Sequence, residues 1–316
     1  MYKRIKFLMI SFIIISLISG CIADQSTNED KEYKQLTIFT TIYPLEYFTK
    51  RIGGSLVSIE NIVPPGSDAH SIDLSPSEMV KVAKGDAFIY SGTGLEGFAM
   101  SIIESLEDEQ VMIVNATENI TLLESSARDQ HSDDEKNHEN EKSEVDPHFW
   151  LDPIRSIEVA DNIKKSLVEL YPEEQEVFEA NFILLKRDLE KLDAEFNDMI
   201  KSAKKKKFIV SHSAYGYWEE RYGLEQIGIS GISPSDEPSQ QQLIEIINLM
   251  GEEGLTHLFF EENLNNKVAK TVQNETGTSP LFLHNLESLS EERREVKEDY
   301  LSIMKNNIKV LGEGLD

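Results

Sequence analysis

The sequence predicts an α/β protein with two halves that are joined by one long helix. Short β-type runs alternate with helical stretches in residues 36–114 and again in residues 207–312, an order typical of parallel sheets whose faces are covered by helices. Between the halves, apolar residues recur at three- and four-residue spacing from about Glu173 onward. Thirty residues of helix would reach about 45 Å, which is long enough to link two lobes.

Local signals define the elements of the first half. Proline opens its first helix, Gly53-Gly54 ends that helix, and Ser75 followed by Pro76 caps the next one. The strands are predicted at Leu36–Thr41, Leu56–Val63, Ala87–Tyr90 and Val111–Val114, and the helices at Pro44–Ile52, Ser75–Lys84 and about Leu95–Leu106.

The helical stretch from Ile154 to about Ser202 links the halves, with Pro172 starting its second, longer helix. The basic run Lys204–Lys207 is interpreted as a solvated helix end. Strands follow at Phe208–Ser211, Glu225–Ile229, Thr256–Phe260 and Pro280–Leu283, with helices near Pro238–Met250, Asn265–Glu275 and Val296–Gly312. These elements predict an N-terminal lobe at 36–153, linking helices at 154–206 and a C-terminal lobe at 207–316.

Length, charge and cysteine content limit the function. The chain has 316 residues, which suits about two domains, and its 40% hydrophobic residues suffice for sizeable cores. A net charge of −26 repels nucleic acid and anionic lipid headgroups, so it excludes most functions that depend on binding either of them. Because Cys21 is the only cysteine, neither a disulfide framework nor a cysteine zinc finger can form within one chain.

The N-terminus has the pattern of an export signal over residues 1–20. Residues 1–6 are basic, Phe7–Ile18 is almost wholly apolar, and two small residues follow. The run ISGC resembles a bacterial lipobox, in which Cys21 is lipidated and becomes the first residue. An uncleaved anchor is the alternative, although the apolar run is shorter than the roughly 20 residues that span a membrane. Either hypothesis places the body outside the cytoplasm, with residues 21–35 as a polar tether.

Residues 125–144 interrupt the first half with a strongly acidic segment. Ala127 is its only apolar residue, so the segment cannot join a core and is expected to form a mobile loop.

Four side chains are candidates for a binding site. His70 follows the second strand and a Pro-Pro-Gly turn, His212 directly follows the strand FIVS, and Glu287 follows the last short strand. His148 lies in the run DPHFWLDP, which begins a helix. Ligands of open α/β sheets bind beyond the carboxyl ends of the strands, and this shared placement groups His70, His212 and Glu287. Spacing alone leaves a structural, hydrogen-bonded histidine as the alternative at each position.

Several runs together resemble the zinc-binding substrate-binding lipoproteins of bacterial metal ABC importers, a family of metal-binding solute-binding proteins. The runs are VPPGSDAHSIDLSP, GTGLEGF, DPHFWLDP, VSHSAYGYW, FFEEN and NLESL, in the family's order and across nearly the whole mature chain. The resemblance implies two (β/α) lobes bridged by a single long helix, with a metal ion in the cleft between the lobes. It implies His70, His148, His212 and Glu287 as the ligands, of which Glu287 lies in the most weakly patterned run.

The resemblance also implies a function. It implies that the chain is a lipid-anchored, extracytoplasmic monomer that captures Zn²⁺ and delivers it to an ABC permease and its ATPase subunit. Three imidazoles and one carboxylate suit tetrahedral Zn²⁺ and leave no open position for a catalytic water, so enzyme activity is not expected. Relatives that look specific for manganese carry a carboxylate where this chain has His212, and Mn²⁺ prefers oxygen ligands.

Alternative interpretations remain for the whole protein and for single residues. A manganese importer component, a surface adhesin with a structural zinc and a zinc hydrolase are the rival functions, although the hydrolase motif His-Glu-x-x-His is absent. His131 and His138 in the acidic loop are either auxiliary zinc ligands or part of a solvated spacer. Side chains expected near the site without binding metal are Trp150, Tyr215, Trp218 and His284; His257 is expected to be structural, and Glu261 or Glu262 could replace Glu287 as the oxygen ligand.

Overall fold

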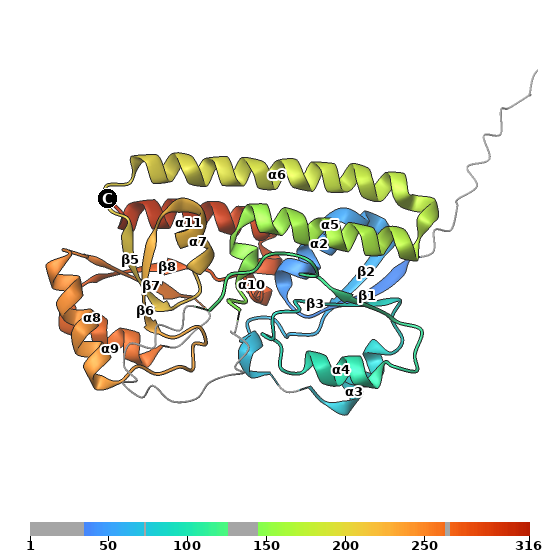
Figure 1. Ribbon diagram of the computed structural model, residues 1–316, viewed down its shortest axis with the longest axis horizontal. Helices are drawn as coiled ribbons and strands as arrows, with labels where there is room; N and C mark the ends of the chain where they lie inside the picture. The colour runs from blue at the N-terminus through green and yellow to red at the C-terminus, as the bar shows by residue number, and fades with distance from the viewer. Residues whose placement is uncertain (1–34, 73, 126–144, 263–265) are drawn as a thin grey trace, which may run out of the picture. The chain divides into compact units, whose positions relative to one another are not determined.

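Two four-stranded parallel sheets organise the chain, so the predicted α/β fold class is confirmed (Figure 1). The computed structural model describes residues 35–72, 74–125, 145–262 and 266–316. The first sheet has the order β2-β1-β3-β4 and the second the order β6-β5-β7-β8, so the two sheets share one topology. Their strands are β1 Leu36–Thr40, β2 Val57–Asn61, β3 Ala87–Tyr90, β4 Met112–Asn115, β5 Lys207–His212, β6 Glu225–Ser230, β7 His257–Glu261 and β8 Ser279–Leu283.

Helices follow most strands, as expected of parallel sheets. We call the first sheet and its helices the N-terminal lobe, and the second sheet and its helices the C-terminal lobe. The N-terminal lobe contains α2 Tyr43–Gly53, α3 Pro76–Val82 and α4 Ala99–Ser105. The linking helices are α5 Pro153–Leu170 and α6 Gln175–Ser202, and the C-terminal lobe contains α7 Gly216–Tyr222, α8 Gln240–Glu252, α9 Lys267–Thr276, α10 Glu291–Glu295 and α11 Tyr300–Gly314.

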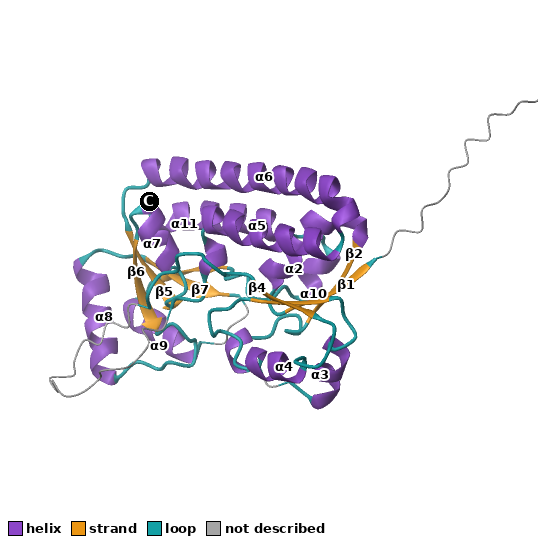
Figure 2. Ribbon diagram, turned by 45° about the vertical axis from the view of Figure 1, so that its right-hand side comes forward, coloured by secondary structure: helices purple, strands orange, loops and turns teal. Residues whose placement is uncertain are grey.

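The helix α6 is the long link that the sequence predicts. Its 28 residues reach about 42 Å, and it packs against α2 of one lobe and α11 of the other (Figure 2). Its apolar stripe is buried, whereas Ile183 on another face is 63% exposed. The fully buried members of the stripe are Phe178, Leu185, Leu189, Leu192 and Phe196. The single helix α6 therefore packs against both lobes and connects them.

Some elements differ from the sequence prediction for local reasons. The helix predicted from Leu95 begins at Ala99, because the preceding loop has positive φ at Gly92 and Gly94 and buries the Glu96 carboxylate against Ser91. The last helix starts at Tyr300 because the Asp299 side chain accepts a hydrogen bond at its N-terminus. The short helices α7 and α10 were not predicted, since seven and five residues show too little periodicity.

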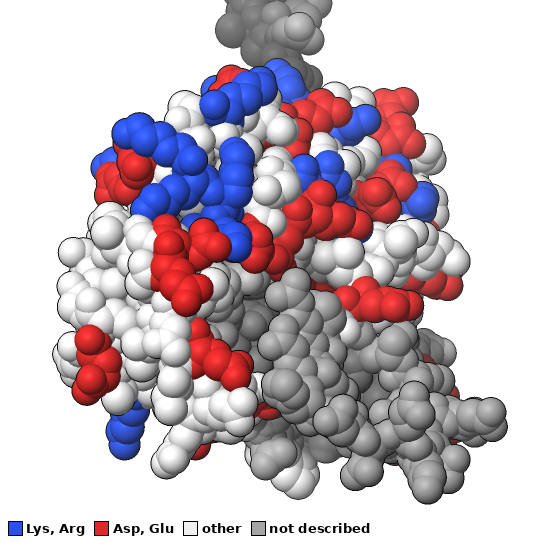
Figure 3. Space-filling view, turned by 60° about the vertical axis from the view of Figure 1, so that its left-hand side comes forward, with Lys and Arg blue, Asp and Glu red and all other residues white. Residues whose placement is uncertain are grey.

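Basic side chains gather at one end of the C-terminal lobe, next to acidic ones (Figure 3). The run Lys204–Lys207 follows α6, its last residue begins β5, and no lysine of the run is buried. The Nζ of Lys207 lies 2.8 Å from a carboxylate oxygen of Glu253, and the Nζ of Lys204 lies 3.8 Å from one of Asp316. The run therefore lies just beyond the C-terminal end of α6 and not within the helix, and it remains in contact with solvent.

Several sequence predictions concern residues outside the described part of the chain. These predictions are the signal segment, nearly all of the tether, the lipidation of Cys21, and the auxiliary ligands His131 and His138. Among the residues that are described, no helix is both long and apolar enough to span a membrane.

Candidate metal centre

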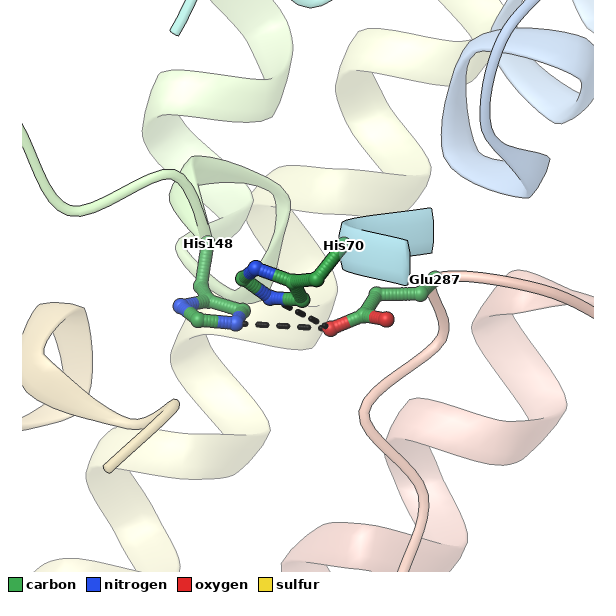
Figure 4. A group of neighbouring side chains, drawn as sticks. All are labelled: His70, His148 and Glu287. Atoms are coloured by element: carbon green, nitrogen blue, oxygen red, sulfur yellow. Dashed lines mark ion pairs between the residues drawn. The ribbon is translucent and has the colours of Figure 1, made fainter. Parts of the chain in front are cut away.

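Three of the four predicted ligands lie together (Figure 4). His70 lies in the 3₁₀ turn Ala69–Ser71 after β2, His148 directly precedes the 3₁₀ turn Phe149–Leu151, and Glu287 follows β8. The Oε1 of Glu287 is 3.6 Å from the Nε2 of His70 and 3.4 Å from the Nε2 of His148. One ligand atom from each residue lies within 4.8 Å of the other two.

His212 lies beside this group without being part of it. It is the last residue of β5, and its ring centroid is 5.5 Å from that of His148. Its side chain is completely buried, and its Nε2 has no hydrogen-bond partner in the described part of the chain. The structure therefore brings the fourth predicted ligand next to the first three, at the carboxyl end of the second sheet.

The candidate ligand atoms share an unusual property. The Nε2 atoms of the three histidines and the Oε1 of Glu287 are buried and lack hydrogen-bond partners among the described residues. Buried polar atoms in proteins are almost always hydrogen-bonded, and leaving one unpaired costs roughly 1–3 kcal/mol. Four unpaired atoms of this kind, all good metal ligands, are chemically suited to share one cation.

Two further carboxylates face the outer nitrogens of the imidazoles. The Oδ1 of Asp146 is 2.8 Å from the Nδ1 of His148, and the Oε1 of Glu261 is 2.6 Å from the Nδ1 of His212. The Asp146 carboxylate is hydrogen-bonded to the His148 ring, which orients the ring and favours the tautomer whose Nε2 lone pair points inward, whereas the His212 Nδ1 is close to Glu261 without a hydrogen bond. Glu261 therefore contacts His212 from outside the three-residue group, and its neighbour Glu262 pairs with Arg293. The sequence analysis gave Glu261 or Glu262 as an alternative oxygen ligand, and neither residue belongs to the group of His70, His148 and Glu287.

Asp146 was missed by the sequence interpretation, although it stands two residues before His148 in DPHFWLDP. Its carboxylate also accepts a hydrogen bond of 3.0 Å from the backbone N–H of His148. Tyr217 of α7 donates its hydroxyl to the Asp146 carbonyl at 2.8 Å. A Cβ on Gly216 would lie only 2.6 Å from the Asp146 Oδ2, so glycine at the start of α7 permits this close approach.

The segment that carries Glu287 is bonded to the opposite lobe. The backbone N–H of Tyr43 donates to the Glu287 carbonyl at 3.0 Å, and the Ser288 hydroxyl donates to the Ser67 carbonyl at 2.7 Å. Arg294 makes a two-bond ion pair with Glu46 of α2, at 2.6 and 2.7 Å. Glu287 therefore follows a strand of the C-terminal lobe but is held against the N-terminal lobe.

The charges of the three-residue group are coupled. Burial by itself would raise the pKa of Glu287, but His148 and His70 outweigh it and hold the pKa well below its usual range. Burial would lower the pKa of His148, but the carboxylates of Asp146 and Glu287 outweigh it and raise the pKa to about 10. In the metal-free protein, a proton on His148 thus supplies positive charge between two buried carboxylates.

The remaining singled-out side chains surround the site. The Trp150 indole donates to the Asn285 carbonyl at 2.7 Å, and its ring centroid is 5.5 Å from that of His148. The Nδ1 of His284 accepts from the backbone N–H of Leu286 at 2.9 Å, and burial together with Arg293 lowers the pKa of His284 to about 4. The structure also places Tyr215 against Glu261 and Trp218 against Leu151, and it leaves His257 away from the site with Thr256 as its partner.

Comparisons with known proteins agree on one family. A family model described as "Zinc-uptake complex component A periplasmic" matches residues 38–314. The chain is 31% identical over 314 residues to the zinc-binding lipoprotein AdcA of Streptococcus pneumoniae, a match that covers 99% of this chain and 61% of AdcA. It is also 31% identical to the high-affinity zinc uptake system protein ZnuA of Bacillus subtilis, with 100% and 99% of the two chains covered.

A solved structure has the same fold. The crystal structure of the Zn(II)-bound ZnuA-like domain of Streptococcus pneumoniae AdcA gives a TM-score of 0.75 at 32% identity, covering 89% of this chain and 99% of that domain. The chain therefore matches one domain of AdcA and spans about 61% of the full length of that relative.

Proposed function

Because this chain belongs to the family of periplasmic zinc-uptake component A proteins, we propose that it captures Zn²⁺ outside the cytoplasm and delivers it to a membrane permease. The observation that carries the proposal is the group formed by His70, His148 and Glu287. Their buried, unpaired ligand atoms come from three distant segments and face one another. A cation would satisfy all of them at once and would compensate for the buried negative charge.

The proposed ligands are the Nε2 atoms of His70, His148 and His212 and the carboxylate of Glu287. An N₃O set of this kind suits tetrahedral Zn²⁺ at about 2.0–2.2 Å. Bringing His212 into the set would require its ring to approach the other three ligands, because it lies outside the three-residue group and its ring centroid is 5.5 Å from that of His148. Asp146 and Glu261 would receive the Nδ1–H groups of two ligands and strengthen their hold on the ion.

The proposed role is transport of the ion and not catalysis with it. Four protein ligands would complete the coordination shell, whereas a catalytic zinc keeps a position open for water or substrate. Three of the candidate ligands, His148, His212 and Glu287, are also almost completely buried, which suits holding an ion.

Location and partners follow from the family and from the N-terminal sequence. The relative AdcA is named a lipoprotein, which supports lipidation of this chain at Cys21 and attachment of the protein to the outer side of a membrane. The proposed partners are an ABC permease and its ATPase subunit, with this chain acting as a monomer. His131 and His138 are proposed as auxiliary, weak zinc ligands.

Zinc is favoured over manganese because three imidazole nitrogens are a poor match for an ion that prefers oxygen. The names of the relatives described above also refer to zinc, which supports the same choice. No contact in the described part of the chain favours adhesion over metal transport.

Metal content tests the proposal directly. Protein purified without chelators is expected to contain one zinc per chain, and His70→Ala, His148→Ala and His212→Ala should each lose tight binding in competition with a chelator. His257→Ala is the matched control, because this histidine lies on β7 away from the site and is partly exposed. Wild-type affinity in the triple variant would refute the ligand assignment, and preferential retention of manganese would refute the choice of metal.

A further inference from the structure

A cavity of about 600 Å³ adjoins the candidate site within the N-terminal lobe. His70 and the following residues form one side of it, Met79 of α3 contributes to its wall, and Gly97, Phe98 and Ser101 line it at the start of α4. The cavity could hold a cation with a shell of waters, because a water molecule occupies about 30 Å³ of liquid volume.

His70 is the only candidate ligand with appreciable contact to solvent. Its side chain is 13% exposed, against 0% for His148, 0% for His212 and 3% for Glu287. Its Nε2 is nevertheless buried, so the exposed part of the ring is a part that does not face Glu287. His70 lines the cavity, whereas His148, His212 and Glu287 are not among its lining residues.

His70 is also the least restrained of the three imidazoles. His148 and His212 each place their Nδ1 against a buried carboxylate, at 2.8 and 2.6 Å. The Nδ1 of His70 has no such carboxylate within the described ranges. The turn that carries it is short and is held by local hydrogen bonds to Asp68, from the His70 N–H at 3.0 Å and from the Ser71 hydroxyl at 3.1 Å. Rotation of the ring would break no outer hydrogen bond of the imidazole.

We propose that this cavity is the passage through which the cation reaches and leaves the site, and that the His70 ring is its gate. The inference rests on the proposed function, since it concerns the path of the captured ion. The ring would swing toward the cavity to admit a hydrated cation and then swing back to ligate it. The segment carrying Glu287 need not move, because it is bonded to the N-terminal lobe at Tyr43 and Ser67.

The test is to narrow the cavity and measure zinc exchange. Ser101→Trp places a large ring at the cavity wall on α4, and Gly97→Leu is a second variant, since a Cβ on Gly97 would meet no atom within 4 Å. Ser105→Trp is the matched control, one turn further along α4 and not among the lining residues. Zinc association and transfer to an excess of a fluorescent chelator are followed by stopped flow, with equilibrium affinity measured separately.

A blocked passage predicts that both rate constants fall by about tenfold or more, while the dissociation constant stays within about twofold. The control variant should exchange zinc as the wild type does. Unchanged rates in both cavity variants would overturn the proposal, and so would weaker affinity with unchanged association, because the cavity would then belong to the site and not to its approach. Failure of the wild-type protein to bind zinc would instead refute the proposed function, so the two failures are distinct.

Discussion

Replacing Glu261 by glutamine tests whether the outer carboxylate of His212 contributes to metal binding. The carboxylate lies 2.6 Å from the His212 Nδ1, and both side chains are buried. Its two oxygens also accept hydrogen bonds from the Tyr215 hydroxyl at 3.4 Å and from the Asn285 amide at 3.2 Å. A glutamine would keep the shape but lose the charge, and its NH₂ group would face a donor. Turning the Asn285 amide to correct this would remove its 3.2 Å bond to the Glu287 N–H.

The expected magnitude is a loss of zinc affinity of about 10- to 100-fold, the usual effect of changing a group that orients a metal-binding histidine. That loss corresponds to about 1.4–2.8 kcal/mol. Competition with a chelator of known affinity, followed by fluorescence, measures the change. Circular dichroism of the zinc-free variant checks that the fold is retained.

Glu262→Gln is the matched control, because the neighbouring carboxylate is 33% exposed and pairs with Arg293 instead of a histidine. Its zinc affinity should equal that of the wild type. A Glu261→Gln protein that is folded and binds zinc within about twofold of the wild type would refute the reasoning that the outer carboxylates support the ligands.

Four other predictions concern the pH dependence of zinc binding and of stability, the packing of α6, and the close approach at Gly216. Because Asp146 and Glu287 raise the pKa of His148 to about 10, zinc should displace about one proton and bind roughly tenfold more tightly per pH unit from about pH 7 to 9, as calorimetry in different buffers would show. Because the folded protein holds this proton on His148 more tightly than the unfolded chain does, protonation also stabilises the zinc-free fold. This contribution is complete below about pH 6.5 and is lost as the pH rises toward 10, so the temperature of thermal unfolding should fall over that range. Phe196→Ala should reduce the free energy of unfolding in denaturant by about 3–5 kcal/mol, because the ring is fully buried. Gly216→Ala should weaken zinc binding about tenfold in chelator competition, because its Cβ would displace the Asp146 carboxylate.

Controls for these predictions lie on the same chain. Ile183→Ala removes an exposed side chain of the same helix as Phe196 and should change stability by less than about 0.5 kcal/mol. Gly251→Ala adds a Cβ in open space on α8 and should leave zinc affinity unchanged. A zinc affinity that does not change with pH would contradict the first prediction. A Phe196→Ala protein whose free energy of unfolding falls no more than that of Ile183→Ala would contradict the prediction on packing, and normal zinc binding by Gly216→Ala would contradict the last one.

The fold class could be predicted from the sequence because it depends on local patterns. The periodic apolar stripe of α6 and the alternation of strands with helices are visible in short windows of residues, and both are present in the structure. The predicted ends of the elements were less accurate where a contact in the neighbouring loop decides them. The buried Glu96 carboxylate, which accepts a hydrogen bond from the Ser91 N–H before α4, is an example.

The candidate site was predictable in its residue types and only partly in its arrangement. His70 and His212 stand where strands end, so the sequence could group them by sheet geometry alone. Glu287 also follows a predicted strand and was grouped with them in the same way, whereas the assignment of all these residues as metal ligands rested on the family resemblance. The contact between Glu261 and His212 was not foreseen, since residues that meet only in space leave no spacing signal along the chain. The role of Asp146 was overlooked although it stands two residues before His148.

The sequence by itself determined the two parallel lobes, the helix that spans them and the chemistry of the candidate ligands, because local periodicity and residue type encode these features. Only the tertiary structure decided which carboxylate faces which imidazole, and that Glu287 is held by Tyr43 of the opposite lobe. The contacts of Glu261 with His212 and of Glu287 with Tyr43 join segments that are far apart in the chain, so no local pattern specifies them.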